Sequence, residues 1–251
     1  MSRGLLARDG LDFGLPTDNG DQMEAFYGTQ LGLPLLQRDT ISEGYYEVFY
    51  EMHRSWLKLN PSDVPMAPAV SGYSELLIAD SGLAEPKSLT DPDGLTVTLV
   101  PTGHRGIDEV GRVIRSVDPD AQRRFITDGM GGVAVGEGHL VGNTMMFVEQ
   151  IDQPLDITPI VCRGFTMLTL VVSDLPSAHA RLIEAGGSHG LRMSTDPAHP
   201  GRCLFSFVRD PGGNWIELCQ FADLSGPLPT LSEPDPSFEE FVAFRDHGTP
   251  A

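Results

Sequence analysis

One carboxylate in this chain stands where it could do chemistry. Glu217 lies in the run from Trp215 to Cys219, directly after the turn Asp210-Pro211-Gly212-Gly213. Because side chains alternate between the two faces of a strand, Glu217 shares a face with Trp215 and Cys219. Burying a carboxylate between two bulky apolar side chains is costly unless the group has a partner or a role. The pattern indicates ligand binding or acid/base catalysis; the alternative is a strand carboxylate that faces water.

A histidine is the second candidate for acid/base chemistry. His139 lies in a short predicted strand, 139–141, and could face a cavity as a ligand or a base. The alternative is a histidine that is hydrogen-bonded for structural reasons alone. The sequence contains no Ser-His-Asp order, no phosphate-cradling glycine loop and no nucleotide fingerprint, which disfavours those classes of enzyme.

Composition narrows the range of partners. The 251 residues include 35 acidic and 17 basic ones, for a net charge of −18. Such a field repels phosphates, so nucleic acid and acidic membrane surfaces are disfavoured as partners. One interpretation of this charge is that it keeps the protein soluble. The alternative is that it attracts a cationic ligand. No apolar run has the length of a membrane span, and a cytoplasmic protein with three reduced cysteines is expected.

The turn before Glu217 has an earlier counterpart. In Asp91-Pro92-Asp93-Gly94 and the strand that follows, Thr98 stands at the position that matches Glu217. Strand–helix–strand patterns begin near residues 11, 110 and 165, and a shortened pattern begins near residue 75. This repetition predicts an α+β fold of βαβββ units in two tandem domains, 8–102 and 108–222, the first of them truncated. The acidic, proline-rich tail 223–251 is expected to dock on the body through its apolar stretch 238–244.

The repeated units, with their closing Asp-Pro turns and the helix expected over 174–187, resemble the vicinal oxygen chelate superfamily. That superfamily includes glyoxalase I, bleomycin resistance proteins and extradiol dioxygenases. The resemblance implies a sheet cupped around a cavity, with any metal held by histidines on opening strands and a glutamate on a closing strand. Glu217 matches the glutamate, but Met167 and Arg112 stand near the expected histidine positions. A transition metal needs at least three protein ligands, so we expect no metal cofactor, with a divalent metal as the alternative.

The same resemblance places opening and closing strands side by side. We therefore expect Arg112 to pair with Glu217 in place of a metal. The cavity is expected in the second domain. The side chains expected to contact its ligand are Arg112, Met167, Trp215, Phe147 and Phe205.

Three functions follow as alternatives. The first is a glyoxalase-like or bleomycin-resistance-like protein that binds a small molecule without metal. The second is a metal-dependent lyase, isomerase or extradiol-type dioxygenase. The third is a metal-free acid/base enzyme that uses Glu217 or His139. In each case the partner is a small molecule, and a homodimer is compatible with the chain.

Overall fold

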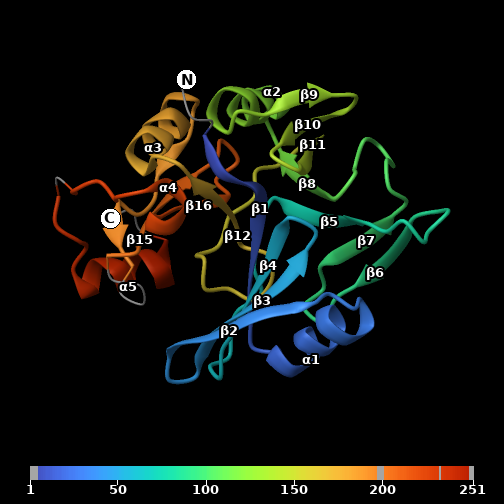
Figure 1. The fold of residues 1–251 in the computed structure, drawn as a ribbon, viewed down its shortest axis with the longest axis horizontal. Coiled ribbons are helices and arrows are strands. Elements are labelled where there is room, and N and C mark those ends of the chain that lie inside the picture. Colours follow the sequence, from blue (N-terminus) through green and yellow to red (C-terminus); the bar gives the residue numbers. More distant parts are fainter. Residues whose placement is uncertain (1–4, 197–200, 232, 249–251) are drawn as a thin grey trace.

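The computed structural model describes residues 5–196, 201–231 and 233–248. They form the expected α+β fold, with two β-sheets and a few short helices (Figure 1). The helical segments are α1 (Gly20–Glu24), η1 (Ala25–Gln30), α2 (Pro119–Arg124), η2 (Phe125–Gly129), α3 (Leu175–Glu184), α4 (Ala222–Ser225) and α5 (Phe238–His247), where η marks a π-helical turn. None of these helices is long and apolar enough to cross a membrane.

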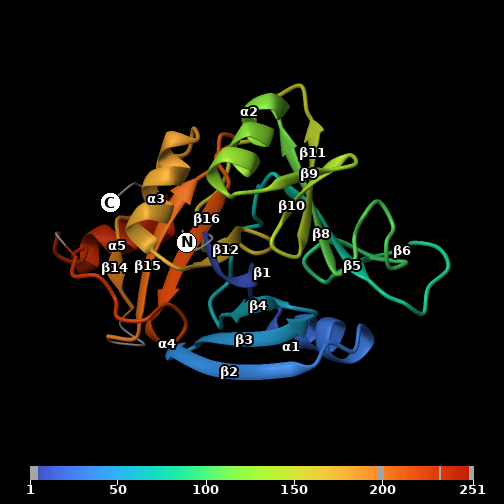
Figure 2. The same cartoon turned by 45° about the horizontal axis from the view of Figure 1, so that its top comes forward.

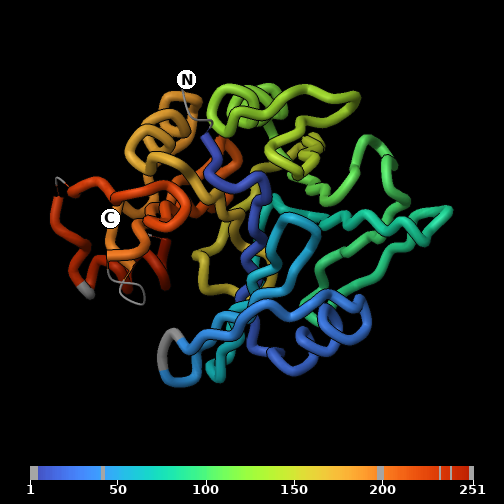
Figure 3. Tube along the Cα trace, in the orientation of Figure 1, coloured from blue at the N-terminus to red at the C-terminus, as the bar shows by residue number. Residues whose placement is uncertain are grey.

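The first sheet has its strands in the order β13-β15-β16-β12-β1-β4-β3-β2, with β14 paired to β15. Its strands are β1 (Leu6–Thr17), β2 (Leu35–Ser42), β3 (Tyr45–Met52), β4 (Ser55–Pro61), β12 (Met167–Val172), β13 (Ser188–His189), β14 (Ser194–Thr195), β15 (Cys203–Arg209) and β16 (Trp215–Phe221). Strand β1 runs through the middle of the molecule (Figure 3). It pairs with β12 in antiparallel fashion and with β4 in parallel fashion.

The second sheet has the order β6-β7-β5-β8-β11-β10-β9. Its strands are β5 (Tyr73–Ala79), β6 (Lys87–Thr90), β7 (Thr96–Val100), β8 (Val110–Ser116), β9 (Val133–Val135), β10 (Gly138–Val141) and β11 (Thr144–Gln150). Residues 73–100 contain three strands and no helix, in agreement with the expected shortened unit.

Each sheet thus combines a unit from the first half of the chain with one from the second half. The first unit pairs with the last, and the shortened unit pairs with the one that follows it. The division into domains 8–102 and 108–222 with a tail 223–251 stays a prediction, because both sheets draw strands from both ranges.

One face of each sheet contributes to a single shared core. On β1, the alternating side chains of Leu11, Phe13 and Leu15 are fully buried in this core. The core also contains Ile114 of the second sheet and Phe125 of η2. Helix α3 packs against η2, so helices carried by different sheets are in contact (Figure 2). We call the face of the first sheet that points away from this core its outer face.

The two Asp-Pro turns link the sheets to each other. Asp210 accepts hydrogen bonds from the Asn214 amide at 2.8 Å and from Nε2 of Gln122, on α2, at 2.8 Å. Asp91 likewise accepts from the hydroxyl of Tyr27, on η1, at 2.8 Å. Each aspartate therefore fixes its own turn and anchors it to a helix packed on the other sheet, so the motif that the sequence repeats is structural.

The C-terminal helix α5 docks on the outer face of the first sheet, as expected for the apolar stretch of the tail. The Phe244 ring is fully buried, with its centroid 5.0 Å from that of Phe207 and 5.2 Å from that of Trp215. Ser237 and Glu240 form a capping box at the start of this helix.

Candidate functional site

A lysine–glutamate pair lies at the centre of the outer face of the first sheet. Nζ of Lys58, on β4, donates to Oε2 of Glu217, on β16, at 2.9 Å. The hydroxyl of Thr169, on β12 beside β16, donates to the same oxygen at 2.6 Å. The side chains of Lys58 and Glu217 are only 11% and 12% exposed. Glu217 is therefore a partly buried, partnered carboxylate rather than a solvated one.

A second carboxylate faces the same ammonium group. Glu47, on β3, lies 3.6 Å from Nζ of Lys58 and accepts a hydrogen bond from Nδ2 of Asn60 at 3.2 Å. Burial by itself lowers the pKa of Lys58, but the charges of Glu217 and Glu47 outweigh it and hold this pKa well above its ordinary value. Lys58 is therefore a fixed cation at neutral pH and a poor nucleophile.

A neighbouring ion pair continues the polar centre along β1. Asp12 is paired with Arg8 and accepts a hydrogen bond from the Trp56 amide at 3.0 Å. The Arg8 guanidinium lies 4.0 Å from the centroid of the Trp56 ring. Burial raises the pKa of Asp12 to about 6, although Arg8 opposes that rise.

The expected pairing of Arg112 with Glu217 is wrong. Arg112 lies on β8 in the second sheet and is fully buried in the shared core. Its guanidinium carbon is 3.4 Å from the centroid of the Phe165 ring, and burial lowers its pKa to about 9. The expectation assumed that the strands of Arg112 and Glu217 adjoin, whereas the structure places them in different sheets.

The structure brings together some of the predicted site residues and separates others. Met167, Trp215 and Phe205 occupy the same outer face as Glu217, since Met167 pairs with Trp215 and Phe205 with Cys219. Trp215 is fully buried beneath α5, and its Nε1 donates to the Thr158 carbonyl at 2.9 Å.

His139 and Phe147 lie in the second sheet, away from this cluster. His139 pairs with Met146 on the face that carries α2. Burial and, to a smaller extent, the charge of Arg123 lower its pKa. Phe147 is buried beneath the Arg105 guanidinium, which lies 4.0 Å from the ring centroid. The catalytic role predicted for His139 and the ligand contact predicted for Phe147 stay predictions.

Lys58 was not among the residues expected in the site, although the sequence contains a signal for it. In Trp56-Leu57-Lys58-Leu59, strand alternation places Lys58 on the face opposite the two leucines. Gly14 lies beside Lys58 in the sheet just as Thr169 lies beside Glu217, so the two charged residues occupy corresponding positions on two closing strands. Alignment of the first and last units would have brought them together.

The residues around Glu217 do not fit a metal ion. The ammonium group of Lys58 occupies the position where a cation would contact the Glu217 carboxylate. Within the described parts of the chain, no group of three or more His, Cys, Asp and Glu side chains is placed to hold a metal.

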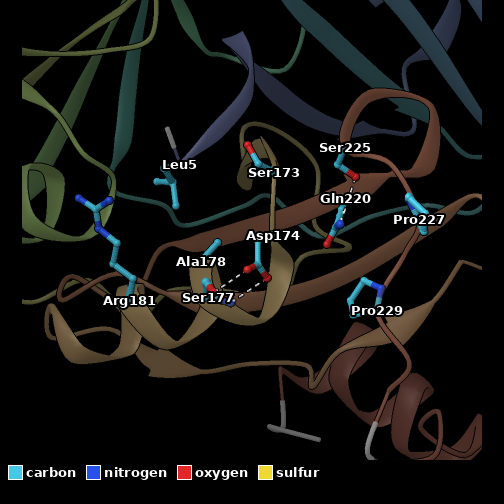
Figure 4. Close-up of a pocket in the computed structure, with 10 residues that line it drawn as sticks. All are labelled: Leu5, Ser173, Asp174, Ser177, Ala178, Arg181, Gln220, Ser225, Pro227 and Pro229. Atoms are coloured by element: carbon cyan, nitrogen blue, oxygen red, sulfur yellow. Dashed lines mark hydrogen bonds between the residues drawn. The ribbon is translucent and has the colours of Figure 1, made fainter. Parts of the chain in front are cut away.

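The structure also contains a surface cavity of about 560 Å³ beside the start of α3 (Figure 4). Its polar groups already have structural roles. Asp174 caps α3 by accepting from the Ser177 amide at 3.3 Å and also accepts from the Ser177 hydroxyl at 2.7 Å. Oε1 of Gln220 accepts from the Leu175 amide at 2.8 Å. Gln220 alternates with Glu217 along β16 and so faces away from the Lys58–Glu217 pair.

Comparison with solved structures identifies the fold. Glyoxalase I from Zea mays aligns with a TM-score of 0.67 at 13% identity, over 87% of this chain and 92% of that one. A provisionally assigned dioxygenase from Bacillus subtilis aligns with a TM-score of 0.59 at 12% identity, over 100% of this chain and 98% of that one. The cppA protein from Streptococcus pneumoniae aligns with a TM-score of 0.51 at 11% identity, over 86% of this chain and 98% of that one.

Neither a family model nor a curated protein sequence matches the chain. At these identities the structural likeness speaks for the fold and leaves the activity open. The resemblance noted in the sequence is confirmed at that level: the chain has the fold of the vicinal oxygen chelate superfamily.

Proposed function

We propose that the outer face of the first sheet binds a small organic molecule without a metal ion. The observation that carries this proposal is the Lys58–Glu217 pair, in which an ammonium group contacts the glutamate that corresponds to a metal ligand of the superfamily. A fixed ammonium group and a carboxylate side by side offer a donor and an acceptor to one ligand. This arrangement favours the bleomycin-resistance-like alternative over a metal-dependent lyase, isomerase or dioxygenase.

The surroundings of the pair support ligand binding. Small-molecule sites combine apolar walls with a few polar groups that fix orientation. Here Trp56 lies on β4 next to Lys58, with Met167 and Phe205 on the neighbouring strands of the same face. The polar groups converge on one point from β3, β4, β12 and β16, which are rigid elements of the sheet.

Metal titration tests the first half of the proposal. We expect isothermal calorimetry with Zn²⁺, Ni²⁺ and Mn²⁺ to show no stoichiometric binding to the wild-type protein. The variant Lys58→Glu, which replaces the ammonium group by a third carboxylate beside Glu47 and Glu217, should gain affinity for divalent cations. One metal ion per wild-type chain, lost in Glu217→Gln, would overturn the metal-independent function.

A fragment screen tests the second half. Ligand-observed NMR on the wild-type protein should yield fragments whose affinity falls at least tenfold in both Lys58→Met and Glu217→Gln. The control is Lys87→Met, which removes an equal charge from an exposed position on β6 of the second sheet. Fragments that bind all four proteins equally well would place the ligand site elsewhere and overturn the proposal.

A further inference from the structure

Strand β9 is the open edge of the second sheet. It is the last strand in the order of that sheet, and in the described parts of the chain no strand pairs with its free side (Figure 2). All three of its residues are exposed, Val133 at 64% and Val135 at 39%. Leu140 of β10 lies directly opposite Val133 and is 36% exposed. This edge therefore presents a small apolar patch, made of Val133, Val135 and Leu140, beside unpaired backbone groups.

Two of the other sheet edges carry charges of the kind that prevents association of edge strands. Strand β2, at the edge of the first sheet, contains Arg38 and Asp39, and β6, at the opposite edge of the second sheet, begins with Lys87. Residues 129–136 contain no charged side chain, although 21% of the chain is charged. Natural sheets protect their edges with charged side chains and proline. Strand β9 has neither, so its edge is suited to contact with another strand.

The hairpin that joins β9 to β10 determines which backbone groups face the open side. Gly136 has a φ of 56°, which suits the first position of a two-residue turn. This turn, 136–137, connects the paired residues Val135 and Gly138. In such a hairpin the two residues that flank the turn bond to each other, and the next residue along each strand points its N–H and C=O groups outward. On β9 that residue is Ala134, so its backbone groups project from the free edge of the sheet.

The sequence of this edge is symmetric about Ala134. Residues 132–136 read Gly-Val-Ala-Val-Gly in both directions. Antiparallel pairing of two copies about a two-fold axis lets the two Ala134 residues exchange both backbone hydrogen bonds, and it places Val133 of each copy opposite Val135 of the other. A two-fold interface requires a surface that is complementary to itself, which selects a second copy of this chain as the occupant.

Charge also limits where two copies can meet. Each chain carries a net charge of −18, so two copies repel each other over most of their surface. The uncharged stretch 129–136 reduces this repulsion at the contact, and Glu137, which follows it, is paired with Arg105 at 3.4 Å. Stable interfaces bury about 1,200–2,000 Å² in total, and a single short strand contributes less. The contact therefore belongs to the weak, reversible class.

We propose that β9 is the surface through which two copies of this chain associate, by antiparallel pairing about Ala134 that joins their second sheets into one continuous sheet. In this dimer, the apolar patch of each copy packs beside that of the other, on the same side of the joined sheet. The proposal goes beyond ligand binding and does not depend on it, since the Lys58–Glu217 pair lies in the first sheet.

Sedimentation velocity over a hundredfold range of protein concentration tests the association. We expect a reversible monomer–dimer equilibrium for the wild type. Val133→Lys should weaken the dimer at least tenfold, because it places an ammonium group against Val135 of the other copy without a partner. This variant lowers the net negative charge of the chain, so stronger repulsion between whole chains does not explain the loss. Val64→Lys, at a loop valine that is 68% exposed, is the matched control and should leave the equilibrium unchanged.

A pair of opposite charges tests the register. Val135→Glu should dimerise as poorly as Val133→Lys does. An equimolar mixture of the two variants places a lysine opposite a glutamate at one end of the contact and two valines at the other, so the mixed dimer should form at least fivefold more tightly than either variant does with itself. Hydrogen exchange gives a second measurement: the Ala134 amide of the wild type should be protected at high protein concentration and unprotected at low concentration.

Three results would overturn the proposal. The first is a wild-type protein that stays monomeric over the whole concentration range. The second is a dimer that Val133→Lys and Val135→Glu leave intact, and the third is a dimer in which the Ala134 amide exchanges as fast as it does in the monomer. In the last two cases the contact lies on another surface. None of these results bears on fragment binding at the first sheet, so the proposed function stands or falls separately.

Discussion

Removal of the Lys58 charge should destabilise the protein more than removal of the Glu217 charge. Lys58→Met leaves Glu47 and Glu217 facing each other without the ammonium group that they share. The side chains of Lys58 and Glu217 are about nine-tenths buried in the wild type. Breaking a buried pair from one side costs about 3–5 kcal/mol. Glu217→Gln keeps an oxygen for Thr169 and leaves Lys58 with Glu47, so its cost should be nearer about 1–2 kcal/mol.

The double variant Lys58→Met/Glu217→Gln relieves the repulsion that the single lysine variant creates. We expect it to be more stable than Lys58→Met alone by about 1–2 kcal/mol, an interaction energy typical of contacting residues. Urea unfolding at pH 7, followed by far-UV circular dichroism, gives the four free energies of the cycle. The control Arg123→Met removes a cation that is 45% exposed and should change little.

The pH dependence provides an independent check on the same pair. Because the folded-state pKa of Lys58 is raised, its contribution is fully present below the pKa of an unfolded lysine, about 10.4, and is lost only as the pH rises beyond that value. The stability gap between wild type and Lys58→Met should therefore be constant from pH 7 to about 9.5. Single variants that each cost under about 0.5 kcal/mol and simply add would refute a buried, coupled pair.

Three further predictions concern single positions. Asp210→Ala should cost about 3 kcal/mol in urea unfolding, because it leaves the buried donors of Asn214 and Gln122 without an acceptor; a loss below about 1 kcal/mol would contradict the anchoring role. Asp12→Asn should gain stability relative to wild type between pH 4 and pH 7. The pKa of Asp12 is raised to about 6 in the folded protein, so ionising this carboxyl as the pH rises through that range lowers the stability of the wild type alone. A stability difference that stays constant with pH would contradict the raised pKa. Gly142→Ala should lower the melting temperature more than Gly136→Ala does. Both glycines have positive φ, but only at Gly142 would a Cβ meet a backbone oxygen, that of Asp9 at 1.8 Å. Equal losses in the two variants would show that this contact relaxes.

Local sequence signals predicted the individual elements well. Asp174 before an apolar run and Gly186 after it bound α3, and Asp118 accepts from the Ala121 amide as an N-cap should. The helix of the pattern that begins near residue 11 is α1, which continues directly into the π-helical turn η1. Over so few turns, the periods of an α-helix and a π-helix place nearly the same side chains in the core, so periodicity could not distinguish them.

Strand partnership could not be predicted in the same way. The opening strands β1 and β12 both present continuous apolar faces, and nothing in either sequence says which of the other units it will join. Because the first unit pairs with the last, Glu217 binds Lys58 and not the expected Arg112. The sequence was sufficient to predict the glutamate, the apolar residues around it and an ion pair. It could not identify the cation, which depends on how the sheets assemble.

The nested pairing of the units has a consequence for synthesis of the chain. The second sheet is built from one continuous stretch, 73–150, and can close as soon as that stretch has emerged. The first sheet needs both ends of the chain, since β1 must wait for β12, more than 150 residues later in the sequence. Contacts of such high sequence separation form slowly. Until then one edge of β1 is unpaired and prone to association with other chains, so a nascent chain halted near residue 160 is the form that most needs a chaperone.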